Sequence, residues 1–240
     1  MDKFRVEVIA QTPNPQQVIY AALHQDYNEN FVFADKANWP SEEKCGEIAV
    51  KRLLVGDRGH YGSLEHPSIV FNCGFFPHGV MQQARTHRVG ISFDCQSMRY
   101  TGQRVIDVAE GRRDVEEVFY LRPIDYYGDR QGKKYFYSSE QRERDLAWCL
   151  EAAKRYAEDI EAGMAEEHAR GKLPFDYRQH FVVSFNCRSL MHFLDLRFKK
   201  DAQIEIQRLC ELIWPHFQAW VPQIAEWYEK SRLGKAKLSP

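Results

Sequence analysis

The sequence has few cysteines, no long hydrophobic run and no excess of either charge. Its six cysteines are scattered through 240 residues without a C-x-x-C pair. That is too sparse for a disulfide framework, so we expect free thiols. The longest apolar run is the six residues from Val18 to Leu23, far short of the ~18 needed to cross a bilayer. The N-terminus, Met1 to Phe4, also lacks the hydrophobic segment of a signal peptide. We therefore expect a cytoplasmic protein.

The charged residues nearly cancel. Lys and Arg number 33 against 34 Asp and Glu, which gives a formal net charge of -1. The chain as a whole therefore attracts neither nucleic acid nor an anionic membrane, and any anion site must be local. Nine histidines are present without an H-E-x-x-H motif, and His60, His66 and His78 are not at ligand-pair spacing. A metal-dependent hydrolase is therefore disfavoured, and no metal site is predicted.

The pattern along the chain predicts one α+β domain over residues 1–240. Neither a repeat nor a Gly/Ser/Pro-rich linker divides it. Strand-like patterns occur at residues 4–9 and 68–76, and apolar residues at helical spacing recur at 146–160, 206–213 and 217–224. Residues 102–140 have a weak pattern that fits either a hairpin or a long excursion. Strands without regular β-α alternation indicate a mixed or antiparallel sheet with several amphipathic helices.

A basic cluster at residues 85–99 is the first candidate site. It holds three arginines and one acid, a local charge of +2. If the chain is extended after Ser97, the hydroxyl of Ser97 and the guanidinium of Arg99 face the same side, as a phosphate-binding pair would. A helix over residues 77–85 would place Gln82 and Arg85 on one face. A solvated basic loop explains this stretch alone equally well.

A second candidate is Arg197. A helix that begins at about residue 189 places Arg197 on the same face as three apolar residues. A guanidinium directed inward must find anionic or carbonyl partners, because burying it unpaired costs several kcal/mol. The same helix brings Arg188 and His192 together at i and i+4 on another side. The structural alternative for Arg197 is an internal salt bridge, for which three carboxylates are candidates: Asp195, Asp201 and Glu205.

These motifs resemble those of the flavin-dependent thymidylate synthases. The signature of that family is Arg-His-Arg, two residues, Ser, four residues, Ser, one residue, Arg. In this chain the corresponding run extends from Arg85 to Arg99 with two extra residues. Thr86 separates Arg85 from His87, and one more residue lies between Arg88 and the first serine.

The resemblance extends to both sides of the signature. Before the signature, a segment with His60, Glu65 and His66 matches. After it, an arginine before a Leu-Pro pair, an Asn-x-Arg-Ser-Leu segment and the helix that follows it also match. Residues 60–100 and 166–206 agree with the family in this order, whereas residues 103–160 agree poorly. Single motifs of this kind are weak, but the ordered set is specific.

The resemblance implies a function and an assembly. Members of the family convert dUMP to dTMP with methylenetetrahydrofolate as the carbon donor, FAD as the hydride carrier and NADPH as the reductant. They are homotetramers whose active sites lie at subunit junctions. Their partners are small molecules, so neither nucleic acid nor a membrane is an expected partner.

The resemblance also implies roles for individual residues. The expected dUMP-binding residues are Gln82, Arg85, Gln96, Ser97, Arg99, Arg170 and Arg197. The expected FAD-binding residues are Ser63, Arg85, His87, Arg88, Asn186, Arg188 and His192. Arg197 is the expected catalytic residue, since a guanidinium held against the uracil ring would polarise it for attack at C5. No side-chain nucleophile is implied, and Cys95 is expected only to line the site.

One alternative from a different class is a nucleic-acid-binding module. In it, the arginines of residues 85–99 would grip a phosphate backbone, and the tyrosines of residues 120–137 would stack on bases. The neutral net charge and the short basic cluster argue against this alternative.

Overall fold

The computed structural model describes residues 3–56, 59–129 and 131–235. Their contacts form two compact units. Unit 1 lies within Met1–Cys73, Ala84–Asp94 and Val182–Pro240, and unit 2 within Gly74–Gln83 and Cys95–Phe181. Each unit has its own helices, which are described in turn.

A four-stranded sheet has the order β1-β2-β6-β3, with β1 at Arg5–Gln11, β2 at Ser68–Pro77, β3 at Ile91–Cys95 and β6 at Arg178–Asn186. Beside one end of β3, the amide of Asn186 donates to the carbonyl of Gly90, and beside the other end the amide of Gln96 donates to the carbonyl of His180. Residue numbers therefore rise along β3 as they fall along β6, so these strands are antiparallel. The α+β class with an antiparallel sheet is confirmed.

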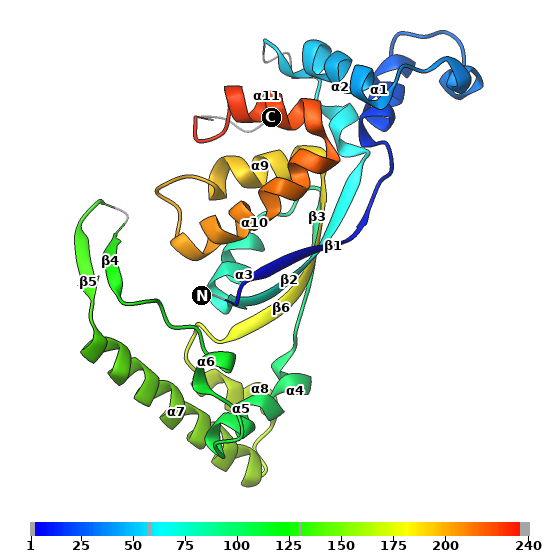
Figure 1. Cartoon of the computed structure of the whole chain (residues 1–240). Helices are drawn as coiled ribbons and strands as arrows, with labels where there is room; N and C mark the ends of the chain where they lie inside the picture. The colour runs from blue at the N-terminus through cyan, green and yellow to red at the C-terminus, as the bar shows by residue number, and fades with distance from the viewer. Residues whose placement is uncertain (1–2, 57–58, 130, 236–240) are drawn as a thin grey trace. The chain divides into compact units, whose positions relative to one another are not determined.

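Unit 1 contains three consecutive C-terminal helices, α9, α10 and α11 (Figure 1), whose buried side chains include Phe193, Ile213 and Ile224. Their bounds are Cys187–Arg197, Ile204–Trp220 and Pro222–Ser231, and the N-terminal helices α1 and α2 span Pro15–Gln25 and Glu42–Ala49. The side chain of Asn186 caps α9 by accepting from the amide of Ser189. Phe185 at the end of β6 contacts Phe193 of α9, with ring centroids 5.2 Å apart. The start of α9 is thus fixed by a cap and by aromatic packing.

Unit 2 is built around the 23-residue helix α7 (Ser139–Glu161), which starts with a capping box formed by Ser138 and Gln141. The shorter helices are α3 (His78–Ala84), α4 (Met98–Thr101), α5 (Gln103–Ala109), α6 (Val115–Val118) and α8 (Glu166–Ala169). Helix α5 packs on α7, and their core includes Met98, Val105 and Cys149. An antiparallel hairpin joins β4 (Asp125–Gly128) and β5 (Lys134–Tyr137), so residues 102–140 contain a hairpin.

Two local predictions differ from the structure. The chain after Ser97 is the short helix α4 and not an extended segment, because Ser97 accepts a hydrogen bond from the amide of Arg99 as an N-cap and Met98 is buried. Helix α10 continues through Pro215 as far as Trp220, and the backbone leaves the helical region only at Val221. The apolar pattern at 217–224 therefore spans two helices.

Candidate functional site

Arg197 lies at the end of α9, partly buried. Its Nε donates to Nε2 of His87 over 3.0 Å, and its Nη2 donates to Oγ1 of Thr86 over 2.9 Å. Because Nε2 of His87 accepts, the ring is neutral with its proton on Nδ1. Burial, together with the charges of Arg197 and His192, lowers the pKa of His87 to about 4. Both of these acceptors of Arg197 are therefore neutral.

His87 also anchors the middle of α9. Its buried ring makes T-shaped contacts with His192 and Phe193, with centroid separations of 5.2 and 5.1 Å. Burial lowers the pKa of His192 as well, although the nearby carboxylate of Asp195 opposes this effect. Two of the predicted flavin residues are thus in direct contact with each other, and one of them also contacts Arg197.

The segment of residues 86–90 is also hydrogen-bonded to the start of α9. The carbonyl of Gly90 accepts from the amide of Asn186 over 3.0 Å, and the carbonyl of Val89 accepts from Oγ of Ser189 over 2.6 Å. Gly90 has a φ of +66°, and a Cβ there would lie 2.2 Å from Nδ2 of Asn186 and from Oγ of Ser189. Only glycine therefore suits this position without rearrangement.

Arg188 of α9 contacts the turn that contains Ser63. Arg188 forms an ion pair of 2.5 Å with Glu65 and lies over the ring of Tyr61, 5.7 Å from its centroid. Ser63 is buried in the 3₁₀ turn Gly62–Glu65, which packs on α9. The other two predicted flavin residues, Arg85 and Arg88, are exposed at the surface of the same unit. All seven predicted flavin residues thus belong to unit 1.

In unit 2, a hydrogen-bonded relay connects two predicted substrate residues. Nδ1 of His78 donates to Oε1 of Gln179 over 2.8 Å, and Nε2 of His78 accepts from Gln82 over 2.7 Å. Nε2 of Gln179 donates in turn to the carbonyl of Gln96 over 3.1 Å, and Oε1 of Gln96 accepts from the amide of His180. The relay therefore holds the side chain of Gln82 and the backbone of Gln96, while the amide of His180 holds the side chain of Gln96.

Two cationic residues of unit 2, Arg170 and Arg104, lie near Tyr177. The ring of Tyr177 stacks on His78 with centroids 4.8 Å apart. Burial raises its pKa, while the nearby cations Arg170 and Arg104 oppose that rise. Arg99 contacts Glu167 of α8 over 3.6 Å, and α4 packs on α8. Ser97, Arg99 and Arg170 are thus carried by neighbouring short helices.

The predicted substrate residues are divided between the two units. Arg85 and Arg197 belong to unit 1, whereas Gln82, Gln96, Ser97, Arg99 and Arg170 belong to unit 2. Their convergence on one nucleotide remains a prediction.

A family model described as "Thymidylate synthase complementing protein" matches residues 7–223. A protein of Haloarcula marismortui named flavin-dependent thymidylate synthase is 32% identical over 247 residues, which cover 98% of this chain and 99% of that protein. A protein of Halobacterium salinarum with the same name is also 32% identical, over 98% of this chain and 100% of its own length. This chain belongs to the flavin-dependent thymidylate synthase family. The resemblance seen in the sequence is confirmed.

Solved structures share the fold of this thymidylate synthase family member. Thymidylate synthase X from Helicobacter pylori, crystallised with FAD and dUMP, has a TM-score of 0.67 at 19% identity over 92% of this chain and 99% of its own. The UMP/dUMP methylase PolB from Streptomyces cacaoi, bound with 5-Br dUMP, has a TM-score of 0.72 at 24% identity over 100% of this chain and 99% of its own. At these identities the likeness supports the fold alone.

Four residues near the predicted positions were missed in the sequence: His78, Gln179, Tyr177 and Arg104. His78 stands four residues before Gln82 on α3, a spacing that could have identified it. Gln179 and Tyr177 lie about a hundred residues further along the chain, so no local pattern connects them to His78. Nη2 of Arg104 donates a hydrogen bond to the sulfur of Met98, and the buried Nε of Arg104 has no hydrogen-bond partner among the described residues.

The cysteines, a metal site and a membrane span are further candidate features. All six cysteines are free, and only Cys95 is exposed; burial raises the pKa of Cys149 and of Cys187 to about 12, so these thiols are poor nucleophiles. In the part of the chain that the structure describes, no group of three or more acidic, His or Cys side chains could hold a metal ion. Nor does that part contain a helix long and apolar enough to cross a bilayer.

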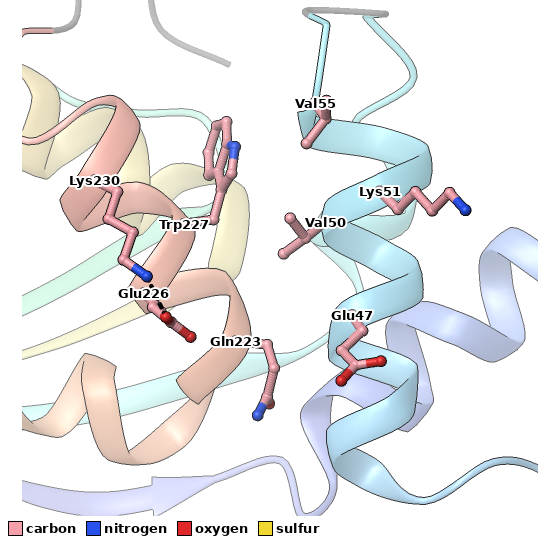
Figure 2. Close-up of a pocket in the computed structure, with 8 residues that line it drawn as sticks. All are labelled: Glu47, Val50, Lys51, Val55, Gln223, Glu226, Trp227 and Lys230. Atoms are coloured by element: carbon pink, nitrogen blue, oxygen red, sulfur yellow. Dashed lines mark hydrogen bonds and ion pairs between the residues drawn. The ribbon is translucent and has the colours of Figure 1, made fainter.

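A pocket of unit 1 lies between α11 and the segment formed by α2 and the π-helical turn Val50–Leu54 (Figure 2). Val50, Val55 and Trp227 form its apolar part, and Glu226 and Lys230 pair with each other at its edge. None of the predicted site residues lines this pocket.

Proposed function

We propose that this protein converts dUMP to dTMP by reductive methylation, with methylenetetrahydrofolate as the carbon donor, FAD as the hydride carrier and NADPH as the reductant. The observation that carries the proposal is the setting of Arg197. In a chain of this family, its guanidinium is fixed at the end of α9 by the neutral acceptors His87 and Thr86. These partners orient the group without neutralising its positive charge.

The residues of unit 2 are proposed to bind the nucleotide through its phosphate and sugar. Arg99 and Arg170 are exposed forks of N–H donors that match phosphate oxygens, and the Ser97 hydroxyl adds a further donor. The Gln82 side chain is oriented by the relay through His78 and Gln179, and the Gln96 side chain by the amide of His180. A preorganised amide binds a sugar or base edge at a low entropic cost.

Arg197 is proposed to act on the uracil ring, with Arg85 as a further contact of the substrate. A guanidinium remains protonated at any relevant pH, so it stabilises negative charge as it develops on a carbonyl oxygen or N3. That charge increases the electron density at C5, where the new carbon bond forms. The chain thus needs no side-chain nucleophile for this step.

The donors along α9 fit a flavin dinucleotide. Arg88, Arg188 and Arg85 offer cationic donors for a pyrophosphate, while His87, His192, Asn186 and Ser63 offer neutral polar atoms for a ring system or a ribose. FAD, when bound, supplies the hydride that completes the methyl group. We further propose that residues 1–240 act as one catalytic domain, and that several subunits of a homotetramer complete each active site at their junctions.

The first test is an omission assay. The purified protein is given dUMP, methylenetetrahydrofolate, FAD and NADPH, and each component is left out in turn. We expect dTMP only when all four are present, and we expect NADPH to bleach the flavin absorbance. Formation of dTMP without flavin, or none in the complete mixture, contradicts the proposal. Salt-dependent binding to DNA or RNA without flavin would favour the nucleic-acid alternative.

Substitutions then separate the roles. Arg197→Ala should abolish dTMP formation while FAD stays bound, whereas Arg208→Ala, at an exposed position of α10, should keep full activity. Ser97→Ala and Arg99→Ala should mainly raise the KM for dUMP. Near-normal turnover of Arg197→Ala would contradict its proposed catalytic role. An unchanged KM for dUMP in both other variants would show that α4 does not bind the substrate.

A further inference from the structure

Thr86 is one of the two residues by which this chain exceeds the signature spacing of its family. Its side chain is exposed, and its hydroxyl accepts from Nη2 of Arg197 over 2.9 Å. The next residue, His87, accepts from Nε of the same guanidinium over 3.0 Å. Two consecutive residues therefore occupy the Nε/Nη2 edge of Arg197.

Two bonds on one edge fix a guanidinium in a way that one bond does not. The bond to His87 at Nε and the bond to Thr86 at Nη2 hold the group at two points of one edge. Together they restrict rotation of its plane and define which way the remaining face points. Catalytic groups depend on such orientation, because small displacements at a reacting centre cost large factors in rate.

The backbone that carries Thr86 is itself attached to α9. At the other end of the same segment, the carbonyls of Val89 and Gly90 accept bonds from Ser189 and Asn186 at the start of this helix. Residues 86–90 therefore run beside α9 and are bound near both of its ends. The position of the Thr86 hydroxyl relative to Arg197 is thus set by the segment and not by one side chain alone.

We propose that Thr86 is a positioning residue that fixes the plane of the Arg197 guanidinium for the reaction. The inference rests on the proposed function of Arg197. A hydroxyl suits the task because it is a neutral acceptor: it orients the guanidinium without pairing its charge, as a carboxylate at the same position would.

The experiment compares Thr86→Val, which keeps the shape and removes the acceptor, with Thr86→Ser, which retains the hydroxyl. Thr12→Val is the matched control, because the Thr12 hydroxyl also accepts one bond, from the amide of Ser68 in the same unit, and is not among the proposed site residues. We expect Thr86→Val to lower kcat about tenfold or more, with little change in the KM for dUMP, in the flavin spectrum or in Tm. Thr86→Ser and Thr12→Val should stay within about twofold of the wild type.

A second readout does not depend on turnover. The NMR order parameter of Nε of Arg197 should fall in Thr86→Val and recover in Thr86→Ser. An unchanged order parameter in Thr86→Val, or equal losses of kcat in the Val and Ser variants, overturns the positioning role. A wild type that forms no dTMP refutes the proposed function instead, and the order parameter still decides whether Thr86 orients Arg197.

Discussion

The buried imidazole of His87 should make the stability of the protein depend on pH. Its pKa is about 4 in the folded chain, because burial, Arg197 and His192 all disfavour the imidazolium, against about 6.5 in an unfolded chain. Between these values the unfolded state binds more protons than the folded state. Stability from this group is therefore fully present above pH 6.5 and is lost as the pH falls from 6.5 toward 4.

The magnitude follows from the two pKa values. They differ by about 2.5, which corresponds to a total of about 3.4 kcal/mol once the pH is below both. At pH 5 an unfolded imidazole is almost fully protonated while His87 remains mostly neutral, so about 2 kcal/mol of the free energy of unfolding should already be lost relative to pH 7.5. His87 is only 6% exposed, so solvent screening reduces this figure little.

The assay is urea unfolding of the wild type and of His87→Gln at pH 7.5 and pH 5. Glutamine offers an acceptor for Arg197 but does not titrate, so the variant should lose about 2 kcal/mol less than the wild type over this interval. The pKa of His192 is lowered too, but this residue is present in both proteins and affects both similarly. Equal pH dependence in the two proteins, or an NMR titration of the His87 ring near pH 6.5, would refute the reasoning.

Three further substitutions and one control substitution test the packing of the two units by urea unfolding at pH 7.5. Gly90→Ala should cost more than about 2 kcal/mol, because its Cβ would collide with the side chains that cap α9; Gly111→Ala, with a φ of +74° and open space, should cost only about 1–2 kcal/mol, and equal costs would refute the collision. Tyr228→Phe should cost about 1.5–3 kcal/mol through its lost 2.8 Å bond to Asp195, and a cost near zero would contradict that bond. Arg104→Met should be neutral or stabilising, since the buried Nε has no hydrogen-bond partner in the described part of the chain; a large loss of stability would show that this guanidinium is well paired.

Much of α9 could be predicted from the sequence because its determinants are local. The apolar period placed Arg197 on the helix that begins near Ser189, and the helix indeed ends at Arg197. The prediction of a helix at residues 77–85 is likewise confirmed by α3 at His78–Ala84. Period and capping act within a few residues, so a single sequence contains the information.

The remaining features depend on contacts that the local pattern does not contain. Helix α4 forms because Met98 enters the core of unit 2, a tertiary effect that overrides the extended reading of Ser97 and Arg99. His78 meets Gln179 across 101 positions of the chain. The pairing of Asp195 with Arg232 could not be predicted from the sequence either, since Arg232 lies 37 positions further on. Long-range pairing of this kind has no periodic signature in the sequence.

Two arginines of unit 1 show how the same side chain can serve structure or chemistry. Arg232 pairs with the buried carboxylate of Asp195 over 2.9 Å. This carboxylate also accepts a hydrogen bond from the hydroxyl of Tyr228, so it attaches α11 to α9. The acceptors on Nε and Nη2 of Arg197, two residues after Asp195, are instead a neutral imidazole and a hydroxyl. A carboxylate in their place would stabilise the guanidinium in the free protein and weaken its pull on an electron-rich ring. The catalytic role proposed for Arg197 is consistent with these two neutral acceptors, because they orient the guanidinium without pairing its charge.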